Sequence, residues 1–161
     1  MLFQFTWVYK GLFDDSEFFT VDPTKVFTFD PDNYPTSSPL KDSPFKKHYY
    51  KLVDKMNNEE FKFASYIDQL DEVEFWVRNL DRDPVNAFWL QTSSDKFYPD
   101  FIIKLKTEKI LVVEWKGDHL KNPDSLEKEH LGLAWAGLSN SLGFTMIYSS
   151  DNMEAKLAKI L

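Results

Sequence analysis

The chain has 161 residues, a net charge of −7 and an isoelectric point of about 4.9. Its hydrophobic content of 43% and aromatic content of 17% exclude a disordered chain, and its length fits one ordinary domain or one domain with an appendage. It contains no cysteine, which excludes disulfides and thiolate metal sites. The start lacks the features of a signal peptide, and no apolar run could span a membrane, so we expect a cytoplasmic protein without a membrane partner.

Residues 1–44 are predicted to form a small β-rich appendage followed by a proline-rich linker. Aromatic and β-branched residues in 3–13 and 16–30 indicate two to four short strands, with a turn at Asp22-Pro23. Four prolines then recur among polar residues up to position 44, which is typical of a linker. We therefore place a domain boundary after residue 44.

Residues 45–161 are predicted to form a second domain that begins with a helical pattern. An apolar stripe predicts a helix over 48–70, which Asn57-Asn58 interrupts, with Asn58 as a candidate N-cap for its second half. A second helix is expected over 122–142, capped by Asp124 or Ser125, with Gly143 just beyond its end. A last helix is expected over 151–161, where Asp151 and Glu154 have the spacing of a capping box. The second of these helices carries five residues spaced for one face: Leu126, His130, Leu133, Leu138 and Leu142.

Strands are expected between these helices. Short β-rich segments lie at 73–80 and 84–92, two more flank a polar turn within 97–117, and a buried strand lies at 144–150. The order from residue 45 is then α-β-β-β-β-α-β-α. This order predicts an α/β (α+β) fold, with a mixed β-sheet flanked by helices.

The hairpin at 97–117, FYPDFIIKLKTEKILVVEWKG, places charges at the ends of two apolar strands. Glu114 and Lys116 are two apart and share one face of their strand, while Trp115 faces the other way. A two-residue turn would oppose Asp100 to Trp115. A three-residue loop would oppose it to Glu114, and a longer loop or a bulge would oppose it to Lys116. We predict an odd loop or a bulge, so that the three charges converge.

Two carboxylates and a lysine on one face suit phosphodiester hydrolysis. Mg²⁺ prefers oxygen ligands and takes only one or two protein carboxylates, and it can polarise a phosphate and activate water. A neighbouring lysine can offset the charge that develops in the transition state. A solvated salt bridge is the alternative interpretation. Glu60 lies on the apolar face of its predicted helix and could join the site, or it could simply favour the helix dipole.

The string YPDF, followed 14 residues after its aspartate by VVEWKG, resembles the PD-(D/E)XK nuclease superfamily. Residues 45–145 further resemble the carboxy-terminal nuclease domain of type III restriction-enzyme-like subunits, which join a DEAD/DEAH-type helicase motor to a nuclease. The resemblance implies a restriction-endonuclease-like fold and a DNA endonuclease dependent on Mg²⁺ or Mn²⁺. It also implies DNA, a helicase motor in cis or trans and a modification subunit as partners.

The resemblance also implies roles for individual residues. Asp100 and Glu114 would be metal ligands, Lys116 the catalytic lysine and Glu60 a further metal ligand. Lys128 would contact a phosphate, although a solvated surface lysine is the alternative. His119 could reach the site or be an ordinary loop histidine. The best basic surface for nucleic acid is the group Lys46, Lys47, His48, Lys51 and Lys55 with Arg78 and Arg82, unless it is a solvated helix face. Lys47, Arg78 and Lys128 are the contacts that we predict.

Two departures from the family pattern qualify these expectations. The chain has no P-loop and only 5 glycines, so it cannot supply its own ATP-driven translocation. The hairpin turn KTEK lacks the glycine that related proteins often carry there. The acidic net charge disfavours nucleic-acid binding by the isolated chain. An alternative function is therefore a non-cleaving DNA-binding or docking module of the same fold that needs a motor or recognition partner.

Overall fold

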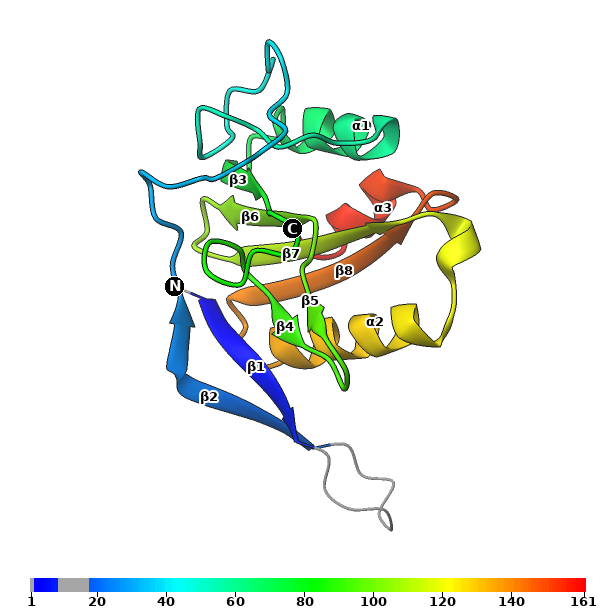
Figure 1. Cartoon of the computed structure of the whole chain (residues 1–161). Helices are drawn as coiled ribbons and strands as arrows, with labels where there is room; N and C mark the ends of the chain where they lie inside the picture. The colour runs from blue at the N-terminus through cyan, green and yellow to red at the C-terminus, as the bar shows by residue number, and fades with distance from the viewer. Residues whose placement is uncertain (1, 9–17) are drawn as a thin grey trace.

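A four-stranded mixed sheet forms the centre of the protein (Figure 1). The computed structural model describes the backbone of residues 2–8 and 18–161, and the side chains from residue 26 onward. The strand order is β3-β6-β7-β8, with bounds Val73–Arg78, Phe101–Leu105, Ile110–Lys116 and Leu142–Tyr148. Only β7 and β8 are parallel, and the two other pairs are antiparallel. This mixed sheet with flanking helices confirms the predicted α+β class.

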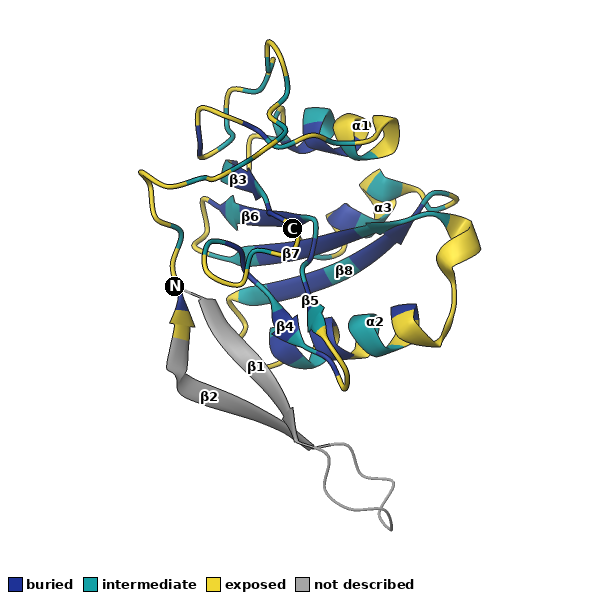
Figure 2. Cartoon of the chain, in the orientation of Figure 1, coloured by how far each residue is buried: buried dark blue, intermediate teal, exposed yellow. Residues whose placement is uncertain are grey.

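Helices cover both faces of the sheet (Figures 1 and 2). Alternate residues of β7 point to opposite faces and enter two separate cores. Leu111 packs in a core with residues of α1 (Asn58–Ile67) and α3 (Met153–Ala158). Val112 packs in the other core, with residues of α2 (Pro123–Ala136). The sheet is therefore buried on both sides, which explains why the two strands of the hairpin are almost continuously apolar.

The β6–β7 hairpin has the register that makes its charges converge. Lys104 pairs with Ile110, and the N–H of Leu105 donates to the carbonyl of Lys109 at 2.8 Å. Three residues, 106–108, form the turn, so the predicted odd count is confirmed. Glu108 takes the left-handed conformation, with φ of 70°, at the position where such loops usually have glycine. The same register extends to place Asp100 opposite Glu114.

The N-terminal part is β-structured, as predicted, but Asp22-Pro23 do not form a turn. β1 (Leu2–Val8) and β2 (Phe18–Phe27) form a two-stranded antiparallel sheet. The predicted turn at Asp22-Pro23 is wrong, because both residues lie within β2. There the register shifts between Phe3 and Phe5, and a proline without an N–H is tolerated in such an irregularity. Residues 9–17 of the predicted strands lie outside the described residues.

The predicted linker packs against the second domain. Phe27, the last residue of β2, belongs to the α2-side core, and in the linker itself the hydroxyl of Tyr34 donates to the carbonyl of Arg78 at 2.7 Å. The N–H of Leu40 donates to the carbonyl of Val53 at 2.8 Å. The boundary after residue 44 stays a prediction, and these contacts run across it.

The helix predicted over 48–70 forms only in its second half. Residues 47–49 instead run beside β3, where Tyr49 N–H donates to the Trp76 carbonyl at 2.8 Å. The N-cap of α1 is Asn57 and not Asn58. Its side chain accepts the N–H of Glu60, whose carboxylate accepts the N–H of Asn57 in return. This capping box starts the helix at Asn58, because residues 47–49 are hydrogen-bonded to β3 and residues 53–55 are hydrogen-bonded to the segment 38–40.

The bounds and the buried face of α2 also differ from the prediction. Asn122 is the N-cap, in place of Asp124 or Ser125, and its side chain accepts the N–H of Ser125. The helix ends at Ala136, and Gly143 lies inside β8. The predicted leucine face points outward, because Gly132 faces the sheet; a Cβ atom there would lie 2.4 Å from the Phe144 ring. The exposed leucines are Leu126, Leu133 and Leu138, while Leu131 and Trp135 are buried.

Two smaller predictions are corrected as well. α3 is capped by Asn152, whereas Asp151 accepts the N–H of Tyr148. The strand expected at 84–92 is reduced to β4 (Leu90–Gln91), which pairs with β5 (Lys96–Phe97) in a separate two-stranded sheet. Asp83 shortens it, because its side chain accepts backbone N–H groups at 85 and 86 and holds a turn.

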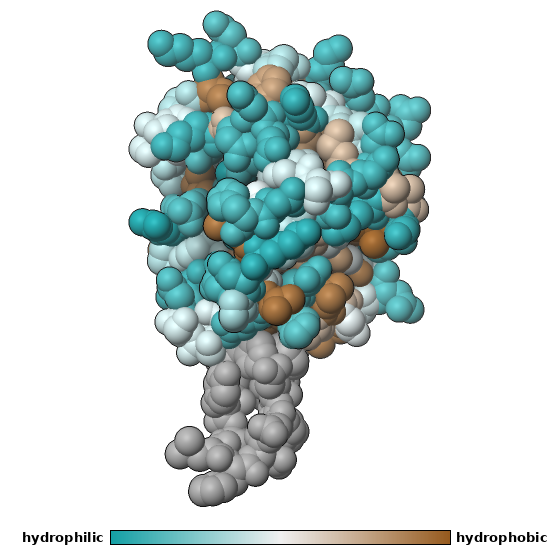
Figure 3. Space-filling model, turned by 90° about the vertical axis from the view of Figure 1, so that its right-hand side faces the viewer, coloured by the Kyte–Doolittle hydropathy of each residue, from teal (hydrophilic) through white to brown (hydrophobic). Residues whose placement is uncertain are grey.

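The outer surface is mostly polar. The face in Figure 3 is largely hydrophilic, with hydrophobic residues scattered over it. Among the described residues, no helix combines the length and the apolar character needed to cross a membrane. A single-turn 3₁₀ helix, η1 (Asp118–Leu120), connects β7 to α2.

Candidate functional site

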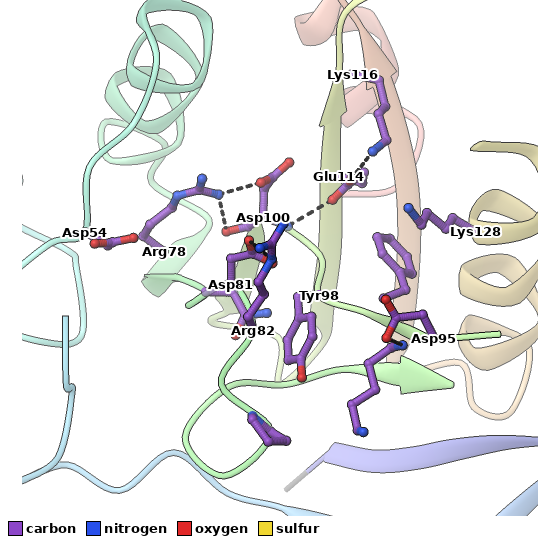
Figure 4. Close-up of a pocket in the computed structure, with 14 residues that line it drawn as sticks. Asp54, Arg78, Asp81, Arg82, Asp95, Tyr98, Asp100, Glu114, Lys116 and Lys128 are labelled. Carbon is purple, nitrogen blue, oxygen red and sulfur yellow. Dashed lines mark hydrogen bonds and ion pairs between the residues drawn. The ribbon is translucent and has the colours of Figure 1, made fainter. Parts of the chain in front are cut away.

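Three of the predicted residues meet where β6 begins and β7 ends (Figure 4). Glu114 and Lys116 lie on one face of β7, and Lys116 Nζ is 2.8 Å from Glu114 Oε1. Asp100 immediately precedes β6 and lies beside them. The Glu114 side chain is only 7% exposed and that of Asp100 is 17% exposed. The charges are therefore largely removed from solvent, unlike those of an ordinary surface salt bridge.

Backbone N–H groups fix the two carboxylates, which we call the carboxylate pair. The N–H of Asp100 donates to Glu114 Oε2 at 3.2 Å, and the N–H of Trp115 donates to Asp100 Oδ2 at 2.8 Å. Each carboxylate thus binds the backbone of the opposite strand. The buried amide of Asn79 also donates to the carbonyl of Pro99 at 2.8 Å. These bonds hold the segment that carries Asp100 in one position.

Arg78, at the end of β3, links Asp100 to helix α1. Its Nη1 lies 2.7 Å from Asp100 Oδ1, and its Nη2 lies 3.3 Å from Glu60 Oε1. The Arg78 and Glu60 side chains are each 12% exposed. The Nε of Arg78 is buried and has no hydrogen-bond partner among the described residues. Glu60 therefore reaches the site through Arg78 and not through direct contact with the carboxylate pair.

Burial and mutual charge shift the pKa values of the site. Burial and the neighbouring Asp100 carboxylate raise the pKa of Glu114 well above its usual range. Burial lowers the pKa of Lys116, but the charges of Glu114 and Asp100 outweigh burial, so that its pKa is raised. Burial raises the pKa of Glu60 against the opposing effect of Arg78. Such clustered shifts are typical of functional sites, although structural ion-pair networks also produce them.

The carboxylate pair and Lys116 line a cleft of about 760 Å³. Figure 4 shows side chains from the loop after β3, the β5 segment, the sheet and α2 around this space. Its described lining residues include equal numbers of basic and acidic side chains. The basic ones are Arg78, Arg82, Lys96, Lys116 and Lys128, and the acidic ones are Asp54, Asp81, Asp95, Asp100 and Glu114. The cleft is polar but carries no excess of positive charge.

The donor set fits one divalent cation held by two carboxylates. Within the part of the chain that the structure describes, no group of three or more histidine or acidic side chains is placed to hold a metal. Asp100 and Glu114 supply oxygen donors at the cleft, and Mg²⁺ or Mn²⁺ needs only one or two of these beside water. Glu60 was expected to be a third ligand, but the structure places it on Arg78.

The other predicted residues are distributed differently. Lys128 lines the cleft, where its Nζ lies 2.7 Å from Asp124 and 5.8 Å from the centre of the Phe97 ring. Arg78 also lines the cleft, but its guanidinium group is already engaged by Asp100 and Glu60 and lies 5.2 Å from the centre of the Phe101 ring. Lys47 lies outside the lining, and its Nζ donates to the carbonyl of Leu70 at 2.5 Å. The five basic residues at 46–55 do not form a helix face, because this segment is not helical. His119 follows β7 in η1 and is not among the described lining residues.

Two residues of the site were not identified from the sequence. Asn79 holds both the Phe88 and the Pro99 carbonyls, each through its amide nitrogen. Tyr98 lines the cleft two residues before Asp100. The sequence gives no signal for the role of Asn79, which depends on a contact 20 residues away. For Tyr98 the signal was its place in the YPD string.

Comparisons with protein-family models, with curated proteins and with solved structures find no match for this chain.

Proposed function

We propose that this chain is the nuclease domain of a helicase-associated, type III restriction-like system, a Mg²⁺- or Mn²⁺-dependent enzyme that hydrolyses phosphodiester bonds in DNA. The observation that supports this most is the convergence of Asp100, Glu114 and Lys116 on one face at the floor of a polar cleft. Backbone N–H groups hold the two carboxylates, and the ion pair with Glu114 holds Lys116, before any ligand arrives. Such preorganised charge is what stabilises a transition state that gains negative charge.

Each residue has a defined role in this proposal. The carboxylate pair would hold the cation, which supplies charge to a phosphate oxygen and an activated water when bound. Lys116 lies on the cleft side of Glu114, where its ammonium group can orient the attacking water and donate to a non-bridging phosphate oxygen. Arg78 keeps Asp100 in place and balances the charge of Glu60. It is a positioning residue in this scheme.

The proposal is tested by cleavage of single-stranded and duplex DNA with Mn²⁺. The wild type is compared with Lys116→Ala and with Lys159→Ala, which removes an exposed lysine after α3. We expect Lys116→Ala to lose at least about a hundredfold in rate, because the loss of one oxyanion-stabilising group typically costs that much. The Lys159→Ala variant should cut at the wild-type rate. Equal cutting by Lys116→Ala and the wild type would contradict the role of Lys116.

A non-cleaving DNA-binding or docking module of the same fold is the second candidate. Two observations favour it: the protein already satisfies all four oxygens of the carboxylate pair, and exposed leucines lie on α2 (Leu126 and Leu133) and just after it (Leu138). In that case the exposed leucines would bind a motor or recognition subunit. The expected result is metal binding or partner binding without cleavage of any DNA by the isolated chain.

A further inference from the structure

Tyr98 is the aromatic side chain that stands in the open part of the cleft. It lies half-buried between Asp95 and Arg82 and below the carboxylate pair (Figure 4). Within the described part of the chain, its ring stacks on no other ring and its hydroxyl makes no hydrogen bond. The neighbouring lining residue Phe97, by contrast, is buried and packs on Phe144. Packing of the core therefore does not explain the position of the Tyr98 ring.

The backbone after Tyr98 is fixed relative to the carboxylate pair. Pro99 follows directly, and its carbonyl accepts the buried Asn79 amide. The N–H of Asn79 donates to the Asp100 carbonyl at 2.9 Å, and the Asp100 N–H is held by Glu114. Because three contacts restrain Pro99 and Asp100, the backbone that carries the Tyr98 ring is held near the groups that would meet a phosphate.

The charge of the cleft limits how a nucleic acid can bind there. Basic and acidic lining residues are equal in number, and the whole chain carries a net charge of −7. Duplex DNA presents mainly its phosphates, so binding of a duplex depends on an excess of positive charge. A single strand also exposes the faces of its bases, which stack on aromatic side chains whatever their sequence. A cleft whose described lining has balanced charge and the half-buried ring of Tyr98 is better suited to the second kind of ligand.

We propose that the cleft binds an unpaired nucleotide, with the base stacked on Tyr98 and the adjoining phosphate near Lys116 and Lys128, so that single-stranded DNA is the preferred substrate class. The position of the phosphate rests on the proposed function, whereas stacking on Tyr98 depends only on the cleft. A duplex would then bind through frayed ends or through strands that a partner has separated.

The test measures binding rather than cleavage. A fluorescent oligothymidylate of about ten nucleotides and a duplex of equal length are titrated with the protein in Ca²⁺, and anisotropy is recorded. Three variants are compared with the wild type: Tyr98→Leu, Tyr98→Phe and Tyr49→Leu. The last is the matched control, because Tyr49 is 39% exposed and lies outside the lining of this cleft.

We expect the wild type to bind the single strand more tightly than the duplex. Tyr98→Leu should weaken single-strand binding about tenfold, while Tyr98→Phe and Tyr49→Leu should retain it. Equal binding by Tyr98→Leu and the wild type, preference for the duplex, or no binding of either DNA would overturn the proposal. A single-stranded RNA of the same length shows whether the ribose matters. A protein that binds single-stranded DNA through Tyr98 but does not cut it would leave this inference standing, because stacking on Tyr98 does not depend on cleavage.

Discussion

The backbone N–H of Asp100 donates to Glu114 Oε2 across the mouth of the hairpin, at 3.2 Å. In the opposite direction, the N–H of Trp115 donates to Asp100 Oδ2 at 2.8 Å. The two acids therefore close the open end of the β6–β7 ladder with their side chains. This explains how a hairpin with two buried faces can carry two carboxylates at its end: each has a backbone donor as well as a cation.

Replacing Arg78 with glutamine should tighten Mn²⁺ binding about tenfold. The guanidinium group lies 2.7 Å from Asp100 Oδ1, and its positive charge repels a Mn²⁺ ion bound to the same carboxylate. Isothermal titration calorimetry measures the change, with Arg82→Gln as the control because Arg82 is exposed and, among the described residues, pairs with Asp81 alone. Weaker Mn²⁺ binding by Arg78→Gln would show that positioning of Asp100 outweighs repulsion.

Replacing Arg78 with methionine should lower the free energy of unfolding by about 3 kcal/mol, because it leaves buried carboxylates without their cation. The double variant Arg78→Met/Glu60→Met should lose less than the sum of the two single changes, since one uncompensated charge is then gone. Urea denaturation of the three variants completes the cycle. Strict additivity would mean that the two side chains do not stabilise each other.

Acid should destabilise the protein through His48. Burial lowers the pKa of His48 from its ordinary 6.5 to about 4, and its neutral ring accepts the N–H of Arg78 on Nε2. Between those two pH values the unfolded state binds a proton that the folded state does not, so stability falls as the pH falls. The loss across the whole window is about 3 kcal/mol.

Denaturation at pH 6.5 and pH 5 checks this effect of His48. The difference between the wild type and His48→Gln isolates the histidine from the titration of the carboxylates. Between pH 6.5 and pH 5, the free energy of unfolding of His48→Gln should fall by about 2 kcal/mol less than that of the wild type. An identical pH dependence in both proteins would exclude the buried neutral histidine as the cause.

A protein with glycine at position 108 should be more stable than one with alanine there. Glu108 has φ of 70°, a conformation that costs an L-residue about 1 kcal/mol relative to glycine. Both Glu108→Gly and Glu108→Ala lose the ion pair with Lys104, so the pair of variants isolates the backbone effect. Glu108→Gly should have the higher melting temperature, and the reverse order would mean that the turn rearranges.

The faces and the register of the hairpin could be predicted from the sequence, because both depend on residues that are close together in the chain. The alternation of Glu114, Trp115 and Lys116 sets the faces, and an odd turn sets the register, which the structure confirms. The ion pair between Arg78 and Asp100 could not be predicted in the same way. It joins residues 22 positions apart, and nothing local to either one indicates the other.

The errors in the helices have a common cause. The spacing of apolar residues predicts that a helix has an apolar face, but it does not show whether that face packs against the sheet or points to solvent. Leu126 and Leu133 have helical spacing and are exposed, because the close contact of Gly132 with Phe144 turns the other side of α2 to the sheet. His48 and Tyr49 open the segment predicted to be helical, yet hydrogen bonds between residues 47–49 and Trp76 of β3 hold them beside the sheet. Tertiary contacts override local propensity in both places.

The most direct test of the account is calorimetric titration of the whole chain with Mn²⁺. We predict one ion per chain, with binding lost in Asp100→Asn and in Glu114→Gln and unchanged in Glu154→Gln, which alters an exposed acid on α3. Because metal binding requires no partner and no particular DNA, the result bears on the site itself. Binding that is the same in Asp100→Asn, Glu114→Gln and the wild type, or no binding by the wild type, would contradict a metal site at the carboxylate pair.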